Sequence, residues 1–291
     1  MNPPCRYSSV GTVKHCLMVA ALLLAGPALG DATVVAAPTA APGAAAAAAA
    51  PTESQREGAR ILKGMADYLA GLRAFTFTFR SGYDVVQPTG QKIEFGETRR
   101  VAMDRPNRLR VEEVASDGTR DLAIFDGRTV TVLKADSDVF AQAPQPGTVD
   151  DTLVYLVRDL KMRMPLAQLM TTRLPVELPR RVKTIDYVES TDIYGVPSDH
   201  IAGRTDSVDF QFWVTEGDHP LPLRVVITYL HAPGEPQYWA NFTDWNTTAK
   251  FKKDEFQFTP PSNARQIPFA VQLKRPVDSA QAPASDGEVK P

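Results

Sequence analysis

Ser198, Asp199 and His200 place a hydroxyl, a carboxylate and an imidazole at consecutive positions. In an extended strand, Ser198 and His200 would face the same side, as a hydrolase requires of its nucleophile and base. A catalytic triad is defined by geometry, however, and the chain has no G-x-S-x-G nucleophile elbow. We therefore interpret the segment as a turn leading into a strand, with His200 hydrogen-bonded or half exposed, and we predict no enzymatic activity.

A metal site is the second chemistry that these residue types could support. His200, His219 and His231 lie within one stretch of the chain, with Asp199 and Asp218 nearby as oxygen ligands. None of them shows a ligand spacing such as H-E-x-x-H, in which two histidines share one face of a helix. The sequence therefore predicts no metal site, and no other motif indicates a cofactor.

Charge argues against nucleic acid as a partner. The formal net charge is −2, and no basic stripe runs along a predicted face. Five arginines do lie close together in the sequence, at positions 99, 100, 105, 108 and 110. On a hairpin they would alternate among faces and turns, which favours a solvated sheet edge as their location.

The first thirty residues have the organisation of a secretory signal. Arg6 and Lys14 form a weakly basic start, an apolar run follows from Cys16 to Leu24, and AGPALG ends in small residues. The apolar run is too short to cross a bilayer, so we expect cleavage after about Gly30 rather than an uncleaved anchor. The two cysteines, Cys5 and Cys16, both precede this point, so the mature chain is predicted to have no thiol or disulfide chemistry.

Composition divides the rest of the chain into three parts. Residues 31–52 are mostly Ala, Pro, Thr and Val, which predicts a disordered linker. Residues 274–291 lack apolar periodicity and are predicted to form a disordered tail. Between them, residues 53–273 are enough for one domain.

The domain is predicted to be mainly β, of the α+β class. Residues 53–72 have helical periodicity, with Thr52 or Ser54 as N-cap. Phe75, Phe77 and Phe79 then alternate with threonine, as in a half-buried strand. About ten strands with short connections follow, which predicts antiparallel pairing. A helical insertion begins near Thr148, and its methionines at 162, 164 and 170 suggest either a compliant lid over a ligand or ordinary core packing.

Large aromatic side chains gather in the C-terminal strands, at Tyr229, Tyr238, Trp213, Trp239 and Trp245. Such a group could bind a glycan or a protein partner. Cross-strand packing is the more frequent role of aromatics in a sheet, and we favour it here.

Taken as a set, several segments resemble an uncharacterised family of predicted periplasmic proteins related to the lipoprotein-localisation factors LolA and LolB. The segments are VFAQAPQPGTVDDTL, YGVPSDHIAGR, VDFQFWV, GDHPLPLRVVITY, PQYWANFTDWN and FQFTPP, and the resemblance covers about residues 55–270. One departure is Ser198, where many relatives would carry a cysteine. This chain therefore lacks any thiol-dependent role at that position.

The resemblance implies a LolA-like fold: an open antiparallel half-barrel, closed by the N-terminal helix and the helical insertion, with acyl chains held on its apolar concave face. On that basis we predict a periplasmic, non-enzymatic protein that binds a lipid or an acylated protein and contacts the membrane transiently. The predicted cavity wall comprises Phe75, Phe77, Phe79, Leu109, Val111, Phe210, Phe212, Val225 and Ile227, with Met162 and Met164 near the entrance.

One alternative uses the same fold without a ligand. LolA-like domains in envelope-stress regulators imply that this chain could instead be a periplasmic sensor or scaffold that binds a protein partner. The cavity distinguishes the two hypotheses. A carrier needs an apolar pocket for an acyl chain, whereas a scaffold can fill the same space with side chains.

Overall fold

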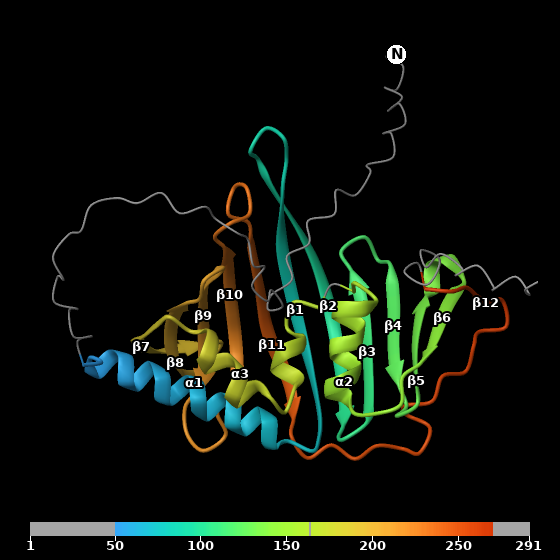
Figure 1. Cartoon of the computed structure of the whole chain (residues 1–291), viewed down its shortest axis with the longest axis horizontal. Helices are drawn as coiled ribbons and strands as arrows, with labels where there is room; N and C mark the ends of the chain where they lie inside the picture. Colours follow the sequence, from blue (N-terminus) through green and yellow to red (C-terminus); the bar gives the residue numbers. More distant parts are fainter. Residues whose placement is uncertain (1–49, 163, 270–291) are drawn as a thin grey trace, which may run out of the picture. The chain divides into compact units, whose positions relative to one another are not determined.

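The computed structural model describes residues 50–162 and 164–269 (Figure 1). The predicted signal peptide (1–30), the predicted linker up to residue 49 and the predicted tail (274–291) lie outside the described residues. The described part contains the whole sheet and all helices discussed below, and none of these helices is long and apolar enough to cross a membrane.

The predicted N-terminal helix is present as α1 (Glu53–Gly71). Thr52 caps it, because its side chain accepts a hydrogen bond from the Gln55 amide while the Gln55 side chain accepts one from the Thr52 amide. The buried stripe includes Ile61, Leu62 and Leu69. Gly58 lies within it because the backbone of β7 passes so close that a Cβ there would be 2.9 Å from the carbonyl carbon of Asp186.

Twelve strands in the described residues form one sheet, rather than the ten or so that the sequence indicates. They are β1 (Ala74–Val86), β2 (Lys92–Asp104), β3 (Arg108–Ala115), β4 (Arg120–Phe125), β5 (Thr129–Lys134), β6 (Val139–Pro144), β7 (Thr184–Ile193), β8 (Val196–Arg204), β9 (Val208–Thr215), β10 (Pro222–Tyr229), β11 (Gln237–Asn246) and β12 (Arg265–Gln266). A short 3-10 turn, η1 (Ala135–Ser137), connects β5 and β6.

The sheet consists of two antiparallel meanders joined in the middle. Its order is β12-β6-β5-β4-β3-β2-β1-β11-β10-β9-β8-β7, so β1 pairs with both β2 and β11. The predicted open antiparallel sheet is therefore confirmed, apart from β12, which pairs with β6 in parallel. The segment FQFTPP (residues 256–261) is not a strand: it forms the end of a turn and an irregular segment that leads to β12. Its two adjacent prolines cannot donate ladder hydrogen bonds.

The helices lie over one face of the sheet, which we call the covered face (Figure 1). Phe75, Phe77 and Phe79 point to it, and strand pairing places Phe210 and Phe212 of β9 on the same side. Helix α1 packs against β7 and β8 and against the insertion. The core of the domain therefore lies between this face and the helices.

The insertion between β6 and β7 has more elements than the sequence indicates. It contains α2 (Val149–Val154), the π-helical turn η2 (Tyr155–Asp159), the 3-10 helix η3 (Ala167–Met170) and α3 (Leu174–Arg181). The sequence analysis did not predict α3. Pro175 occupies its first turn, where proline is tolerated, but Pro179 inside it conceals the helical pattern.

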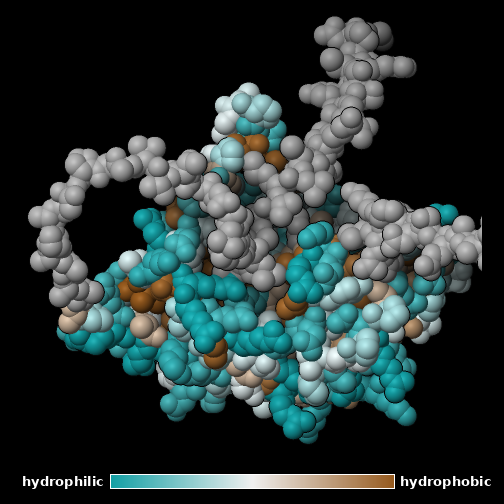
Figure 2. Space-filling model, in the orientation of Figure 1, coloured by the Kyte–Doolittle hydropathy of each residue, from teal (hydrophilic) through white to brown (hydrophobic). Residues whose placement is uncertain are grey.

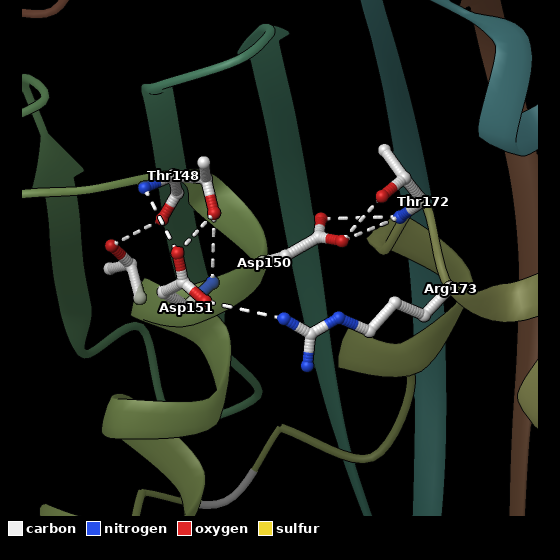
Figure 3. A network of polar contacts seen from close by, with 6 residues as sticks. Thr148, Asp150, Asp151, Thr172 and Arg173 are labelled. Carbon is white, nitrogen blue, oxygen red and sulfur yellow. Dashed lines mark hydrogen bonds and ion pairs between the residues drawn. The ribbon is translucent and has the colours of Figure 1, made fainter.

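Polar contacts fix the beginning of the insertion to the segment that precedes α3 (Figure 3). Thr148 caps α2 as predicted, in a reciprocal contact with Asp151. The buried Asp150 carboxylate accepts hydrogen bonds from the Thr172 amide at 3.0 and 3.1 Å and from the Thr172 hydroxyl at 2.6 Å. Arg173 forms an ion pair with Asp151 at 3.3 Å. These contacts hold the two ends of the intervening chain together.

Candidate functional site

The floor of the candidate site is a group of stacked aromatic rings in the middle of the covered face. Phe77 lies between Phe75 and Phe79 on β1, with ring centroids 6.2 and 6.0 Å away. From β11, the indole of Trp245 stacks on Phe77 at 4.4 Å, and Phe242 lies 6.0 Å from the same ring. We call these five residues the aromatic floor. The two neighbouring strands β1 and β11 hold them rigidly, because each ring projects from a hydrogen-bonded ladder.

A short stretch of the insertion lies over this floor, and we call residues Met164–Met170 the covering segment. Its Met164, Leu166, Ala167, Leu169 and Met170 line an apolar pocket together with Leu69 of α1. The covering segment has little regular structure of its own, since only η3 is helical and the preceding Lys161 has a left-handed backbone, with φ 56°. The pocket thus has a rigid floor and an irregular roof.

The pocket is narrow in this conformation. Its cavity volume is about 20 Å³, which is about the space of one water molecule. The side chains of the covering segment occupy most of the region above the aromatic floor. An acyl chain would fit only if the covering segment moved away from the sheet.

Five of the eleven predicted wall residues line this pocket: Phe75, Phe77, Phe79, Val111 and Met164. The other six are elsewhere in the core. Met162 packs against the cluster of Val130, Ala143 and Leu156. Leu109, Phe210, Phe212, Val225 and Ile227 are buried outside the pocket, and pairing places them on the covered face as well. Contact of any of these residues with a ligand stays a prediction.

Phe242 and Trp245 line the pocket but are not among the predicted wall residues. Three positions separate them, so strict alternation would place them on opposite faces of β11. The register between β1 and β11 shifts in this region, and Asp244 has a left-handed backbone with φ 55°. This irregularity brings both rings to the floor, as a β-bulge does. No pattern of two-residue period could have indicated it.

Arg105 joins the covering segment to the end of α1. Its Nη1 donates to the carbonyl oxygens of Leu69, Ala70 and Leu72 at 2.8, 3.0 and 2.6 Å, and its Nη2 donates to that of Met170 at 2.8 Å. The guanidinium also lies 5.3 Å from the centre of the Phe75 ring. Burial lowers the pKa of Arg105. One cation therefore satisfies carbonyls at the ends of two separate helices.

A second arginine belongs to what we call the polar cluster: Ser81, Glu97, Arg99, Glu113 and Tyr238. Arg99 lies at the margin of the pocket, with its guanidinium 5.9 Å from the Phe79 ring centre. Its Nε donates to Glu113 at 2.8 Å, and its Nη2 lies 3.1 Å from Glu97, which also accepts from Ser81 at 3.1 Å. Burial raises the pKa of Glu97 and that of the Tyr238 hydroxyl.

The predicted solvated edge for the arginines is wrong for two of them. Strands β2 and β3 lie near the middle of the sheet, not at its edge. The Arg99 side chain is only 12% exposed, and Arg105 is 8% exposed. Arg100, at 73% side-chain exposure, is solvated as expected, although its strand does not lie at the edge of the sheet. Alternation along β2 decides the difference, because Arg99 points to the covered face and its neighbour points away.

The residues with potential chemistry at 198–200 do not form a catalytic arrangement. Ser198 is fully buried, and its hydroxyl donates to the Thr191 carbonyl at 3.4 Å. The His200 ring stacks on Trp213, with centroids 4.1 Å apart, and its Nε2 lies 3.1 Å from Gln211 Oε1. His200 therefore has a packing role in strand β8 and does not contact the Ser198 hydroxyl as a general base would.

His219 and His231 each contact a different neighbour. His219 makes an edge contact with the Tyr68 ring at 5.3 Å, and His231 Nε2 lies 2.7 Å from the Asp206 carbonyl oxygen. Within residues 50–162 and 164–269, no three His, Cys, Asp or Glu side chains gather in a way that could hold a metal ion.

The C-terminal aromatics separate onto the two faces of the sheet. Trp245 belongs to the aromatic floor, whereas Trp213 and Trp239 lie on the opposite face, where the Arg224 guanidinium is 5.6 and 5.7 Å from their ring centres. Trp239 also donates to Glu94 at 2.9 Å. Cross-strand packing accounts for these contacts, as the sequence analysis favoured.

The long β1–β2 hairpin extends beyond its neighbours and carries an exposed apolar row (Figure 1). Phe95, Ile93 and Val85 are 43, 39 and 37% exposed, and the Tyr83 ring stacks on Phe95 at 6.1 Å. Figure 2 shows hydrophobic side chains on this hairpin below a more hydrophilic tip. Large exposed apolar side chains that lie side by side are typical of an interaction surface.

Comparison with protein families gives one match that spans most of the chain. The model of a family described as "Predicted periplasmic protein (DUF2092)" matches residues 58–270. No curated protein matches the chain.

Several solved structures are similar over about 70% of the chain at low identity. Mycobacterium tuberculosis lipoprotein LppX is 12% identical, covering 68% of this chain and 99% of that chain with a TM-score of 0.43. The LolA superfamily protein NE2245 of Nitrosomonas europaea is 8% identical, covering 69% and 97% with a TM-score of 0.36. MucB in the Pseudomonas aeruginosa MucA/MucB complex is 18% identical, covering 70% and 61% with a TM-score of 0.38.

Proposed function

The chain belongs to the DUF2092 family, and we propose that it is a non-enzymatic periplasmic protein that holds an acyl chain between the aromatic floor and the covering segment. The acyl chain would belong to a lipid or to an acylated protein. The family description supports the periplasmic location, as does the predicted signal peptide at residues 1–30, with cleavage after about Gly30.

The observation that carries the proposal is the contrast between the aromatic floor and its cover. Five aromatic rings in the centre of a twelve-stranded sheet lie under a segment that has only one short 3-10 helix. A segment with few internal hydrogen bonds opens more easily than a regular helix, so this cover can move while the floor stays in place. Methionines at both ends of the covering segment, Met164 and Met170, can repack against ligands of irregular shape.

Opening follows from how the covering segment is attached. Arg105 holds its end through the Met170 carbonyl, and Asp150 holds the adjacent Thr172. Between these points and η2, the segment contacts the sheet mainly through apolar side chains. An acyl chain would replace those apolar contacts with equivalent ones, so displacement would cost less than exposing the floor to water.

Trp245 offers a direct test, because its indole forms part of the floor while Trp213 and Trp239 lie on the opposite face. In a Trp213→Phe, Trp239→Phe variant, emission comes from Trp245 alone. We expect fatty acids brominated along the chain to quench this emission saturably, since bromine atoms quench only a nearby indole. Absence of saturable quenching by a folded protein would contradict the proposal.

The matched control places the reporter on the other face. A Trp245→Phe variant keeps Trp213 and Trp239, and we expect the same brominated lipids to leave its emission nearly unchanged. Native mass spectrometry of the mature protein from the periplasm complements this test. Under the proposal, an acylated compound co-purifies with the wild type, and lipid extraction identifies it.

A second candidate function rests on the β1–β2 hairpin. The exposed row of Val85, Ile93 and Phe95, together with the narrow pocket, supports a sensor or scaffold that binds a protein partner. In that case, acyl lipids would not quench Trp245, and a charge at the hairpin, such as Phe95→Glu, would abolish partner binding. If lipid binding is observed and Phe95→Glu has no effect on it, the pocket is the functional site.

A further inference from the structure

We propose that the polar cluster selects the headgroup of the bound ligand, accepting hydrogen-bond-donating headgroups without net negative charge and disfavouring anionic ones. This inference rests on the proposed function, since it concerns the polar end of an acyl ligand in the same pocket. It assigns a chemical class, a neutral or zwitterionic amphiphile, to a site whose walls are otherwise apolar.

The polar cluster adjoins the aromatic floor along β1 and β2. Along β1, the side chains on the covered face run from Phe75, Phe77 and Phe79 to Ser81. Arg99 pairs opposite Phe79, and Glu97 pairs opposite Ser81, so the apolar floor passes directly into charged groups. Arg99 is the one ionisable side chain among the described residues that line the pocket. A ligand whose chain lies along the floor would therefore place its polar end at the cluster.

The polar cluster has more carboxylates than cations. Arg99 is already paired with Glu113 at 2.8 Å and lies 3.1 Å from Glu97, so one cation faces two carboxylates. Both glutamates are largely buried, at 11 and 25% side-chain exposure. An anionic headgroup placed here would face two carboxylates and one cation, so it would meet net repulsion at a largely buried site and would compete with them for Arg99. A donor headgroup leaves both pairs in place.

The polar cluster has hydrogen-bond acceptor sites that its own contacts do not use. Carboxylates have about four acceptor sites each, and the contacts described above use only part of them. The Tyr238 hydroxyl, on a side chain only 2% exposed, has no hydrogen-bond partner within 3.5 Å in the described part of the chain, although Ser81 is close enough to act on its pKa. Buried polar groups are nearly always satisfied, so an unpartnered hydroxyl beside a charged pair indicates a missing partner. A hydroxyl or ammonium group of a ligand would donate to these acceptors.

The neighbouring charges do not alter this balance. Asp121 pairs opposite Glu113 on the covered face, and its carboxylate forms an ion pair with Lys134, so the two cancel. Glu112 and Arg110 pair with each other at 2.7 Å on the other face. The cluster thus keeps one excess carboxylate beside Arg99, which is its only member that lines the pocket in the described part of the chain.

The experiment compares four oleoyl compounds that share one chain and differ in headgroup: monooleoylglycerol, lyso-oleoyl-phosphatidylethanolamine, lyso-oleoyl-phosphatidylglycerol and oleate. Each displaces a brominated acyl lipid from the full mature protein, and recovery of Trp245 emission gives its affinity. We expect monooleoylglycerol and the phosphatidylethanolamine compound to bind at least about tenfold more tightly than the phosphatidylglycerol compound and oleate, because the last two carry net negative charge.

Glu113→Gln tests the cause of this preference, since it removes the excess carboxylate but keeps the Arg99–Glu97 pair. We expect the preference to fall below about threefold in this variant. Glu112→Gln is the matched control, because it changes the adjacent residue on the opposite face and should leave the preference unchanged. Circular dichroism confirms that both variants are folded.

Three outcomes are distinguishable. Selectivity that disappears in Glu113→Gln and persists in Glu112→Gln supports the inference. Equal affinities for all four compounds, or tighter binding of the anionic pair, overturn the inference while the proposed function stands. If the brominated lipid does not quench Trp245 saturably, the proposed function fails, and the headgroup inference fails with it.

Discussion

The aromatic floor and the covering segment meet at the same pocket but are held in different ways. The floor belongs to two central strands, β1 and β11, and each ring contacts two or more others. The covering segment has a single 3-10 helix, and polar contacts hold it mainly at its C-terminal end. Local stability depends on such differences in packing and hydrogen bonding. The comparison indicates that any space for a ligand arises from movement of the cover, while the floor stays fixed.

Truncating the floor should have the largest effect on stability. Phe77→Ala removes a 5% exposed ring that four aromatic neighbours contact, so we expect a loss of about 3–5 kcal/mol in the free energy of unfolding. Leu169→Ala in the covering segment truncates a half-buried side chain, and the expected loss is about 1 kcal/mol. Urea denaturation measures both values. Equal losses would mean that the cover is as rigidly packed as the floor.

Removing the Arg105 side chain should release the cover selectively. Arg105→Leu leaves four carbonyl oxygens without their donor, and we expect a loss of about 2–4 kcal/mol. Hydrogen exchange should increase in η3 and at the end of α1 but not in β1. Unchanged exchange in η3 would show that apolar contacts alone hold the covering segment in place.

Asp150 also holds the C-terminal side of the covering segment, through Thr172, and its removal should have a smaller effect on stability than that of Arg105. Asp150→Ala removes an acceptor that receives both the amide and the hydroxyl of Thr172, so we expect a loss of about 1–2 kcal/mol. Proteolysis within residues 164–172 should become faster, because the base of the cover is freed. Gln168→Ala is the control, since its side chain donates a hydrogen bond to Glu177 at 3.2 Å. Similar cleavage rates in both variants would argue against a role for Asp150.

The smallest expected effect is a pH dependence of the free energy of unfolding that is caused by Glu97 of the polar cluster. Burial, followed by repulsion from Glu113, raises the pKa of Glu97 above its ordinary value of 4.5. The folded state therefore binds this proton more tightly than the unfolded state, so its contribution to stability is present below pH 4.5 and is lost as the pH rises through the folded pKa. Stability of the wild type relative to Glu97→Gln should fall from pH 4 to pH 7. A flat difference would contradict the raised pKa.

Much of the architecture follows from local patterns. The helical periodicity of residues 53–72, the alternation of Phe75, Phe77 and Phe79, and the short turns between strands were sufficient to predict the first helix and the antiparallel sheet. These features depend on residues close in sequence, which is where periodicity and turn chemistry carry information. The signal peptide and linker follow from composition and stay predictions.

The candidate site was harder to predict, for a physical reason in each case. Trp245 reaches the floor through an irregularity in β11, and Arg99 is buried because its strand lies in the middle of the sheet. Phe210 and Phe212 have the expected alternation and lie outside the pocket, because the covering segment closes only the central strands. Which part of a broad apolar face is left for a ligand depends on tertiary contacts of the insertion.

The pairing of β1 with β11 also has a consequence for how the chain acquires its structure. Thr78 faces Thr243 across this pair, so the first strand is completed by almost the last. Proteins dominated by such distant contacts fold slowly, because loop closure precedes the stabilising contacts. We expect refolding to be slow relative to a helical protein of the same size. Until β11 pairs with it, the free edge of β1 and the aromatic rings beside it would remain exposed in the partly folded chain.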